Sequence, residues 1–356
     1  MLRALVATAT IAVLCGTSHA ETPDSAIERA GPPADHRGKL TYSGEAMGTT
    51  VSVWFWTDKE SEAAKAAEAL FAEMKRLDLE MTTWKPDSDV SRINAAAGDK
   101  PVVVSDETRA VIARALDISR RSSGRFDITV QAFHGLWKFD EDMDGTLPDA
   151  AEVKKRVALV NWKDVVLDSR RKTVFLRRKG MAITLGGIAK GYAVDKCVAL
   201  LKQRGFTDFM VQAGGDMYVA GSKGPTPWVV GIRDPRGPKD SMFATAPIKD
   251  HSFSTSGDYE RGFVKDGVRY HHILDPSSGQ PARTSRSVTI RAKDAFTADA
   301  WSKVMFIAGW KTGMQLIKAN KLEDFDAVWV DADNSVHSTQ AIERDLRTLK
   351  TPTPGT

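Results

Sequence analysis

Residues 262–275 read GFVKDGVRYHHILD, in which two short apolar segments flank the dipeptide Asp266-Gly267. Asp-Gly at this place is typical of a two-residue β-hairpin turn, because both central positions of such a turn need a positive φ. The stretch therefore predicts an antiparallel pair of strands.

Other predicted strands and helices intermingle around this hairpin without regular alternation. Alternating β-branched and aromatic residues predict strands in TVSVWFW (50–56), DFMVQAG (208–214), PWVVGIRDP (227–235), SRSVTIRA (285–292) and FDAVWVDAD (325–333). Apolar residues at helical spacing predict helices in DKESEAAKAAEALFAEMKRLDLEM (58–81), DETRAVIARALDISRRSS (106–123) and AVDKCVALLKQRG (193–205). We expect an α+β fold, a single mixed body with antiparallel sheets and flanking helices, rather than a doubly wound parallel one.

The N-terminus has the pattern of a secretory signal. Arg3 precedes the apolar run ALVATATIAVL, which is too short to span a bilayer comfortably, and SHA follows it. We expect a signal peptide at 1–20, a flexible leader at 21–38, a folded domain at 39–345 and a disordered tail at 346–356. The mature protein is then periplasmic or otherwise exported, without stable membrane insertion. Lipoprotein anchoring at Cys15 is not expected, because Leu14 is bulky.

Composition favours a small-molecule substrate. The 356 residues are 42% hydrophobic and 27% charged with a net charge of +4, and no run of lysine and arginine suggests a nucleic-acid or membrane-surface partner. Cys197 would be the one cysteine of the mature chain, so no internal disulfide is possible. We expect Cys197 to be a small buried hydrophobe.

Two glycine pairs leave structural and functional interpretations open. LGGIAKGYAVDK (185–196), between strand-like MAITL and a helix, is a tight turn or an anion site whose backbone N–H groups and Lys190 meet a phosphate. VQAGGDMYVAG (211–221), with Asp216, brings backbone close to a ligand or forms a bulge. STSGDYERGF (254–263) supplies hydrogen-bonding side chains or is a surface loop.

Histidines and aromatic residues give further candidates. His271 and His272 should face opposite sides of a strand, so one of them could point into a site as a general base, although a structural histidine is commoner. Trp84 and the aromatic residues of FHGLWKF (133–139) could stack on a flat ring, or belong to the core.

The stretch TADAWSK (297–303) places Lys303 one helical turn after Asp299. The two side chains share a helix face, so they could form an exposed ion pair; alternatively, Asp299 belongs to a cation site that Lys303 enters. No HExxH, P-loop, GxSxG or GxGxxG motif is present. From the residues alone, the sequence indicates a site for a phosphorylated ligand, with aromatic side chains that could stack on a flat ring of that ligand.

Read in order, the motifs resemble the ApbE family, the FAD:protein FMN transferases. The resemblance rests on AMGTT (46–50), TTWKPDSDVSRIN (82–94), GRFDITVQAFHGLWKF (124–139), LGGIAKGYAVD (185–195), QAGGDMYVAG (212–221), WVVGIRDP (228–235), STSGDY (254–259), YHHILDPSSGQPA (270–282) and TADAWS (297–302). It covers nearly the whole of the expected folded domain, and the joint order of the motifs is far more specific than any one of them.

The resemblance implies that the protein binds FAD with a divalent cation, usually Mg²⁺, and moves FMN onto a threonine or serine hydroxyl of an acceptor flavoprotein, releasing AMP. By position it implies FAD contacts at Met47, Trp84, Arg125, Phe126, Asp127, Thr184, Lys190 and Ile273. It implies metal contacts at the Gly187 carbonyl and at Asp299, which we also expect to be catalytic. His272 is the expected base or orienting group for the acceptor hydroxyl.

Two positions depart from the family pattern. Thr184 stands where an acidic residue is usual, and Lys303 where a threonine follows the metal-binding aspartate. A protonated lysine cannot ligate a metal, but its ammonium group could occupy the cation position. The main hypothesis is a transferase with altered cation use; the alternatives are an FAD carrier or store, or an FAD pyrophosphatase. The sequence identifies neither the acceptor, the oligomeric state nor the preferred cation.

Overall fold

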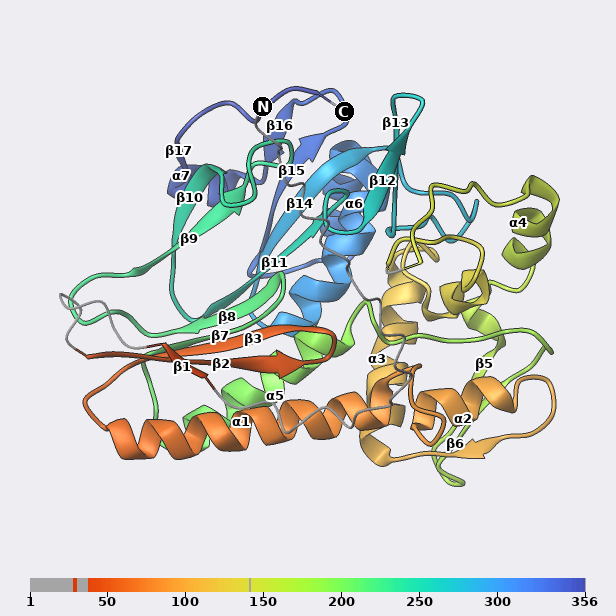
Figure 1. Cartoon of the computed structure of the whole chain (residues 1–356), viewed down its shortest axis with the longest axis horizontal. Helices are drawn as coiled ribbons and strands as arrows, with labels where there is room; N and C mark the ends of the chain where they lie inside the picture. The colour runs from red at the N-terminus through yellow and green to blue at the C-terminus, as the bar shows by residue number, and fades with distance from the viewer. Residues whose placement is uncertain (1–27, 31–37, 141, 356) are drawn as a thin grey trace, which may run out of the picture.

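An antiparallel sheet organises the fold (Figure 1). The computed structural model describes residues 28–30, 38–140 and 142–355. Within these residues the largest sheet has nine strands, and every neighbouring pair is antiparallel. In spatial order they are β1 (Glu28–Ala30), β2 (Lys39–Ala46), β3 (Thr49–Trp56), β7 (Phe209–Ala213), β8 (Asp216–Ala220), β11 (His251–Gly257), β14 (Ser285–Ala292), β15 (Phe325–Asp331) and β16 (Val336–Ser338).

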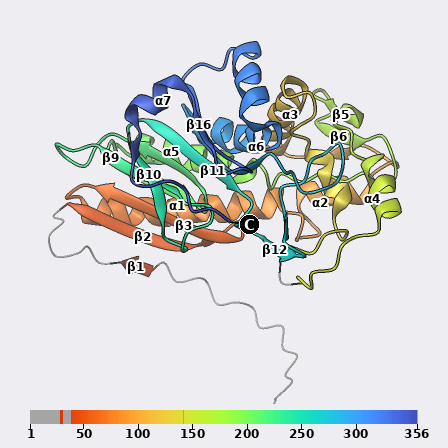
Figure 2. The same cartoon turned by 90° about the horizontal axis from the view of Figure 1, so that it is seen from above.

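Three helices cover one face of this sheet: α1 (Glu60–Met81), α5 (Ala189–Gln203) and α6 (Ala295–Ala319) (Figures 1 and 2). They bury the main core, because alternate side chains of each strand point towards them. Val51, Val53 and Phe55 of β3 are fully buried in this core, as is Leu70 of α1. The free thiol of Cys197 in α5 is also buried, so its expected role as a small hydrophobe is confirmed.

A second, smaller core lies on the opposite face. Val219 of β8 and Phe253 of β11 pack there. Their partners belong to a three-stranded sheet of β9 (Trp228–Arg233), β10 (Met242–Ile248) and β17 (Arg347–Thr348), and to α7 (Gln340–Asp345). The large sheet is therefore covered on both faces here, which is why six of the seven residues of β15 are buried.

The remaining elements form a flank beside the helices (Figure 1). They are α2 (Asp89–Ala95), β4 (Val102–Val103), α3 (Asp106–Arg121), the 3-10 helices η1 (Ile128–Phe133) and η2 (Trp162–Asp164), α4 (Ala150–Val157), β5 (Val165–Asp168) and β6 (Thr173–Leu176). The predicted hairpin is confirmed as β12 (Gly262–Lys265) and β13 (Val268–His271). Its turn residues Asp266 and Gly267 have φ of 51° and 74°, as a two-residue turn requires.

The α+β expectation is confirmed, but three local predictions differ from the structure. MAITL (181–185) is not a strand, because the side chain of Asn94 forms hydrogen bonds with both the N–H and the C=O of Ile183. Residues 254–257 belong to the buried strand β11 rather than to a surface loop. The expected disordered tail is wrong for residues 347–353, since β17 pairs with β10 and Thr353 donates to the buried Asp234.

The N-terminal predictions fall mostly on residues that the structure does not describe. The expected signal peptide at 1–20 lies outside the described residues, as does the expected leader except for 28–30, which form β1, and 38. Across the described ranges, none of the helices combines the length and apolarity that crossing a membrane would require.

Candidate functional site

Four charged side chains from three elements meet between α5, α6 and the sheet. We call them the site cluster: Lys190 at the start of α5, Asp216 at the start of β8, and Asp299 and Lys303 on α6. Lys190 Nζ lies 3.6 Å from Asp216 Oδ2, and Ser254 Oγ donates to Asp216 Oδ1 at 2.5 Å. Asp216 and Asp299 are buried, whereas the side chains of Lys190 and Lys303 keep 25% and 22% of their surface exposed.

Gly191 brings the two helices together. A Cβ at this position would collide with the Ala295 carbonyl oxygen and lie 2.7 Å from the Asp299 Cβ. Glycine therefore permits a close α5–α6 approach in which Gly191 N donates to Asp299 Oδ2 at 2.9 Å. The approach places the Asp299 carboxylate against the backbone of Gly191, the residue that follows Lys190 in α5.

Lys303 takes the other side of Asp299. Its ammonium group donates to Asp299 Oδ1, and also to the Asp299 backbone oxygen at 2.9 Å. The predicted pairing on one helix face is confirmed, but the pair is not a solvent-exposed one, because Asp299 is fully buried. A buried carboxylate needs such partners, since an unpaired charge is costly away from water.

The pKa shifts in the site cluster follow from burial and mutual charge. Burial raises the pKa of Asp299, as does the Asp216 carboxylate, while Lys303 and Lys190 oppose that shift. Burial lowers the pKa of Lys190, but the carboxylates of Asp216 and Asp299 outweigh it and hold this pKa above its ordinary value. Lys190 therefore carries its charge at neutral pH.

The two neighbouring histidines have different surroundings. His271 is buried: its Nε2 lies 2.8 Å from the Ala282 oxygen, and its Nδ1 accepts the Ile273 N–H at 3.3 Å. His272 Nδ1 lies 3.4 Å from the Arg261 oxygen, which favours a proton on Nδ1 and leaves Nε2 as the acceptor. His271 is thus satisfied structurally, whereas His272 keeps a free basic nitrogen.

His272 is uncharged at neutral pH. Burial lowers its pKa well below the usual value, and the positive charges of Arg261 and Lys303 act in the same direction. This influence of Lys303 links His272 to the site cluster. A neutral imidazole has a lone pair on Nε2 that can accept a proton from a hydroxyl group.

The first glycine pair forms a tight turn that also carries Lys190. Gly186 N donates to Thr184 Oγ1 at 3.1 Å, and Thr184 N to the Ile128 oxygen at 2.8 Å. Lys190 Nζ lies 3.5 Å from the Gly186 oxygen. The structure therefore contains the turn, and it places an ammonium group and the positive end of α5 beside it.

Phe126 and Asp127 support this turn. A Cβ on Gly187 would lie 3.2 Å from the Phe126 ring, so the ring packs closely against the turn. Both carboxylate oxygens of Asp127 are engaged, Oδ1 by Thr129 N at 2.8 Å and Oδ2 by Trp162 N at 2.9 Å. Burial raises the pKa of Asp127 against these hydrogen bonds. The Asp127 side chain therefore fixes local backbone.

Three other predicted FAD contacts lie in connections between regular elements, and their described contacts are not with the site cluster. Met47 occupies the β2–β3 turn with φ of 53°, and its backbone hydrogen-bonds to Asp78. Arg125 donates to the Ser122 oxygen at 3.2 Å. Ile273 is buried, and its backbone oxygen accepts the Ala282 N–H at 2.9 Å.

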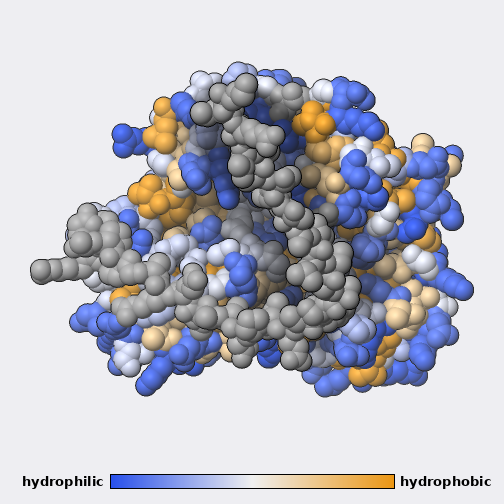
Figure 3. Space-filling view, viewed as in Figure 1, coloured by the Kyte–Doolittle hydropathy of each residue, from blue (hydrophilic) through white to orange (hydrophobic). Residues whose placement is uncertain are grey.

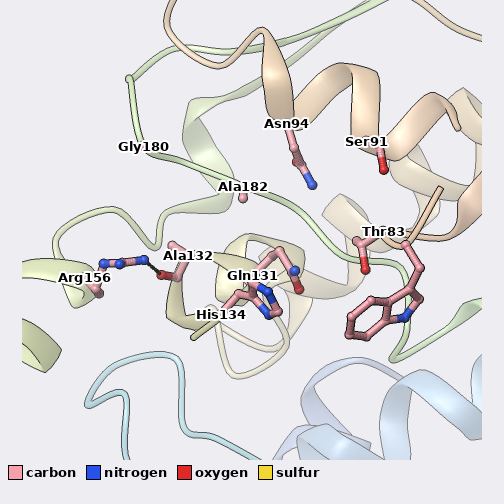
Figure 4. A pocket seen from close by; sticks show the side chains of 10 residues that line it. Thr83, Ser91, Asn94, Gln131, Ala132, His134, Arg156, Gly180 and Ala182 are labelled. Carbon is pink, nitrogen blue, oxygen red and sulfur yellow. Dashed lines mark hydrogen bonds between the residues drawn. The ribbon is translucent and has the colours of Figure 1, made fainter. Parts of the chain in front are cut away.

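A cavity of about 390 Å³ opens between α2, η1 and residues 180–182 (Figure 4). Trp84 is 76% exposed at its edge, and its ring lies edge-on to His134 with 6.1 Å between the ring centres. Trp84 lines this cavity, but the other predicted FAD contacts do not; the lining comprises Thr83, Trp84, Ser91, Asn94, Gln131, Ala132, His134, Arg156, Gly180 and Ala182. Trp137 and Phe139, by contrast, are buried and stacked on each other, as core residues are.

Apolar surface lies near the turn of the hairpin that precedes His272. The hairpin β12–β13 leads away from this histidine, whose backbone N–H donates to the Arg261 oxygen at 3.1 Å. Val264 and Val268 of the hairpin are 50% and 40% exposed, and orange surface is visible in that part of Figure 3.

The arrangement does not fit the implied divalent cation at Asp299 and Gly187. Lys303 and Gly191 N occupy the two oxygens of the Asp299 carboxylate. Unit charges roughly 4 Å apart interact by about 4 kcal/mol at an effective dielectric constant near 20, so a divalent ion beside the Lys303 ammonium group would meet about twice that repulsion. In the described part of the chain, no three His, Cys, Asp or Glu side chains are grouped to hold a metal.

Asp216 is the residue that the sequence did not assign to the site. Its strand position and preceding glycine pair allowed a structural or a ligand-binding interpretation. Its proximity to Lys190 depends on how α5 packs on β8, which no local pattern reveals. The available signal was an aspartate at the start of an apolar predicted strand, where a charged residue is rarely buried without a partner.

Comparison with known proteins covers the region that carries this site. A sequence model described as the ApbE family matches residues 47–329. The chain is 31% identical over 297 residues to the FAD:protein FMN transferase of Klebsiella pneumoniae (strain 342), covering 83% of this chain and 90% of that one. It is 32% identical over 319 residues to the FAD:protein FMN transferase of Treponema pallidum (strain Nichols), with coverages of 85% and 87%.

Solved structures give the same result. The ApbE protein from Thermotoga maritima superposes with a TM-score of 0.78 at 33% identity, over 87% of this chain and 99% of that chain. The flavin transferase ApbE from Vibrio cholerae superposes with a TM-score of 0.76 at 25% identity, over 86% and 99%.

Proposed function

The chain belongs to the ApbE family, and we propose that it is an FAD:protein FMN transferase that moves FMN from FAD onto a threonine or serine hydroxyl of an acceptor protein. The observation that carries the proposal is the pair of ammonium groups of Lys190 and Lys303 held by buried carboxylates, together with a neutral histidine, His272, whose pKa the charge of Lys303 helps to lower. This arrangement combines an acceptor for a proton with positive charge for phosphate oxygens.

The proposed reaction gives each of these groups a role. The acceptor hydroxyl oxygen attacks the phosphorus of the FMN half of FAD, and a new O–P bond forms. The bond from that phosphorus to the bridging oxygen breaks, and AMP leaves with this oxygen. The hydroxyl proton passes to Nε2 of His272, while Lys190 and Lys303 stabilise the negative charge on the phosphate oxygens.

Asp216 and Asp299 act in this scheme by positioning. Asp216 lies 3.6 Å from the Lys190 ammonium group, and Asp299 binds Lys303. Each carboxylate keeps one lysine charged and limits its rotamers, so that the charge is in place before FAD arrives. No step requires a metal ion at Asp299.

The proposal includes export of the mature protein. Support comes from the secretory pattern of residues 1–20, with expected cleavage after Ala20. N-terminal sequencing of the protein from a periplasmic fraction should begin at Glu21. An intact Met1 terminus on the cytoplasmic protein would contradict export and leave the proposed activity untouched.

The activity is tested with an acceptor protein of known mass. The purified mature chain is incubated with FAD and a threonine-bearing acceptor domain, with a threonine-to-alanine acceptor as the control. We expect the intact acceptor to gain the mass of FMN, together with one AMP for each labelled molecule.

Two outcomes would favour the alternative functions over transfer. Release of AMP and free FMN, without labelling of several acceptors, would indicate an FAD pyrophosphatase. Tight FAD binding with neither product would indicate a carrier.

A further inference from the structure

Lys303 binds a buried carboxylate where the family resemblance implies a divalent cation. We propose that the Lys303 ammonium group takes the place of that cation, so that this protein binds the FAD pyrophosphate with two lysines and without a divalent metal. The inference rests on the proposed function only in taking FAD as the ligand.

The first argument is the occupation of Asp299. This fully buried side chain receives Lys303 Nζ on Oδ1 and the Gly191 N–H on Oδ2. A metal ion could bind Asp299 only if Lys303 moved away, and Lys303 is also held by the Asp299 backbone oxygen at 2.9 Å. The lysine is therefore anchored at two points in the position that a bound cation would need.

The second argument is the charge of the site cluster. With both carboxylates ionised, Asp216 and Asp299 balance the two ammonium groups of Lys190 and Lys303. Before FAD binds, a divalent cation would add two positive charges to this neutral and largely buried cluster. Without Lys303 the cluster would carry one excess negative charge, the condition under which carboxylate oxygens attract a hard cation.

The third argument is that the Lys303 ammonium group keeps an N–H donor for a ligand. A lysine has three N–H donors, and Lys303 uses two of them on Asp299. Its side chain remains 22% exposed, and its charge contributes to the lowered pKa of His272. The ammonium group thus keeps one N–H donor for a phosphate oxygen while it is anchored on the buried carboxylate.

The test compares metal binding and FAD affinity in three full-length mature proteins: wild type, Lys303→Thr and Lys318→Thr. Lys318 is an exposed lysine of the same helix, so its replacement is the matched control. Binding of Mn²⁺, which prefers the same oxygen ligands as Mg²⁺, is measured by electron paramagnetic resonance with and without FAD. FAD affinity is measured by flavin fluorescence in EDTA and in Mg²⁺.

We expect wild type and Lys318→Thr to bind no stoichiometric Mn²⁺, and their FAD affinity to change less than about twofold between EDTA and Mg²⁺. Lys303→Thr should bind about one Mn²⁺ and gain about tenfold in FAD affinity from Mg²⁺, the size of a typical coupling between two ligands.

Stoichiometric Mn²⁺ in the wild type, or a loss of FAD affinity of about tenfold or more in EDTA, would overturn the inference. These wild-type measurements decide it even if Lys303→Thr fails to fold. Metal-independent FAD binding without FMN transfer would remove the proposed function and leave the inference standing. Metal-dependent FAD binding with efficient transfer would overturn the inference and leave the proposed function standing.

Discussion

Helix α5 takes part in two charged clusters that differ in what they leave free. The site cluster contains Lys190, Asp216, Asp299 and Lys303. The second, which we call the junction cluster, joins α1, α3 and α5 through Arg76, Glu107, Tyr192 and Lys196. Glu107 there accepts from Tyr192 Oη at 2.6 Å, Arg76 at 2.6 Å and Lys196 at 3.0 Å.

The two clusters show how a charge network that holds a fold differs from one that can bind a ligand. Burial raises the pKa of Glu107, but hydrogen bonds from Tyr192, Lys196 and Arg76 outweigh it and lower this pKa to about 2. One carboxylate there consumes three donors. In the site cluster each carboxylate faces one lysine, and both lysines keep donors for a further anion. The burial of its two carboxylates and the position of Lys190 at the glycine turn, rather than the number of charges, distinguish the site cluster.

The largest effect should come from His272. Replacement by alanine removes the proton acceptor, so FMN transfer should fall by about 10² to 10⁴-fold, with FAD affinity nearly unchanged. The matched variant His271→Asn should lower the thermal unfolding temperature and keep most of the transfer rate. Equal losses of rate in the two variants would contradict the assignment of His272.

The pH profile of transfer sharpens this test. Because the pKa of His272 lies well below its usual value of 6.5, the base stays neutral in mildly acidic solution. The transfer rate should therefore fall only below pH 6.5. The contrary result is a transfer rate that halves at pH 6.5, with no such pH dependence in His272→Ala. It would show that His272 titrates like an imidazole in ordinary solvent surroundings.

Lysines of one helix provide the next comparison. Lys190→Met removes a phosphate-binding cation and should reduce transfer by about 10² to 10³-fold and weaken FAD binding. Lys196→Met, in the junction cluster, should change transfer by less than about threefold, since exposed or partly exposed pairs contribute little. Initial rates and FAD titrations of both variants decide whether the two clusters differ as described.

The junction cluster should show its effect in stability. Glu107→Gln should lower the free energy of unfolding at pH 7 by about 1 to 3 kcal/mol, the usual cost of breaking a hydrogen-bonded charge network. Because the folded pKa is lowered from 4.5 to about 2, the stabilisation is present above pH 4.5 and is lost as the pH falls through about 2. Urea denaturation from pH 7 to pH 3 should show wild type and variant converging, with the transfer rate at pH 7 unaltered.

The last expected effect concerns Asp195, which connects α5 to α6. It accepts the backbone N–H groups of Ala295 at 2.7 Å and Phe296 at 3.0 Å. Burial, together with Asp294, raises its pKa from 3.8 to about 7. The folded protein thus holds this proton more tightly than the unfolded chain, so stability should decrease as the pH rises between about 4 and 7.

Asp195→Asn removes this titration, so its free energy of unfolding should vary less between pH 5 and pH 8 than that of the wild type. Denaturant titrations of both proteins at the two pH values provide the measurement. Identical slopes would show that Asp195 is not the titrating group. A loss of transfer in the folded variant would indicate that the carboxylate also positions α6.

Local sequence patterns predicted the elements whose signals are local. Asp266-Gly267 specified the hairpin because its turn needs two positive φ values, and the four-residue spacing of Asp299 and Lys303 specified their pairing. The core interpretation of Trp137 also held. In each of these cases the contact lies close in sequence or follows from the period of the element.

Contacts between distant segments escaped prediction. The strand-like MAITL is not a strand because its backbone binds the side chain of Asn94, 89 positions from Ile183. The C-terminal segment looked disordered, yet Thr353 reaches Asp234, 119 positions away. The place of Asp216 in the site also escaped prediction, because it depends on the packing of α5 on β8. Tertiary placement of this kind has no signature in a single stretch of residues.

The most direct test of the account is the rate of FMN transfer by wild-type protein that has been stripped of metal and kept in EDTA. Covalent flavin on the acceptor is followed by intact mass, beside a parallel reaction in Mg²⁺. The account predicts transfer at rates within about twofold of each other, because Lys303 and Lys190 already supply the positive charge at the phosphates. Transfer that ceases in EDTA and returns with Mg²⁺ would contradict it.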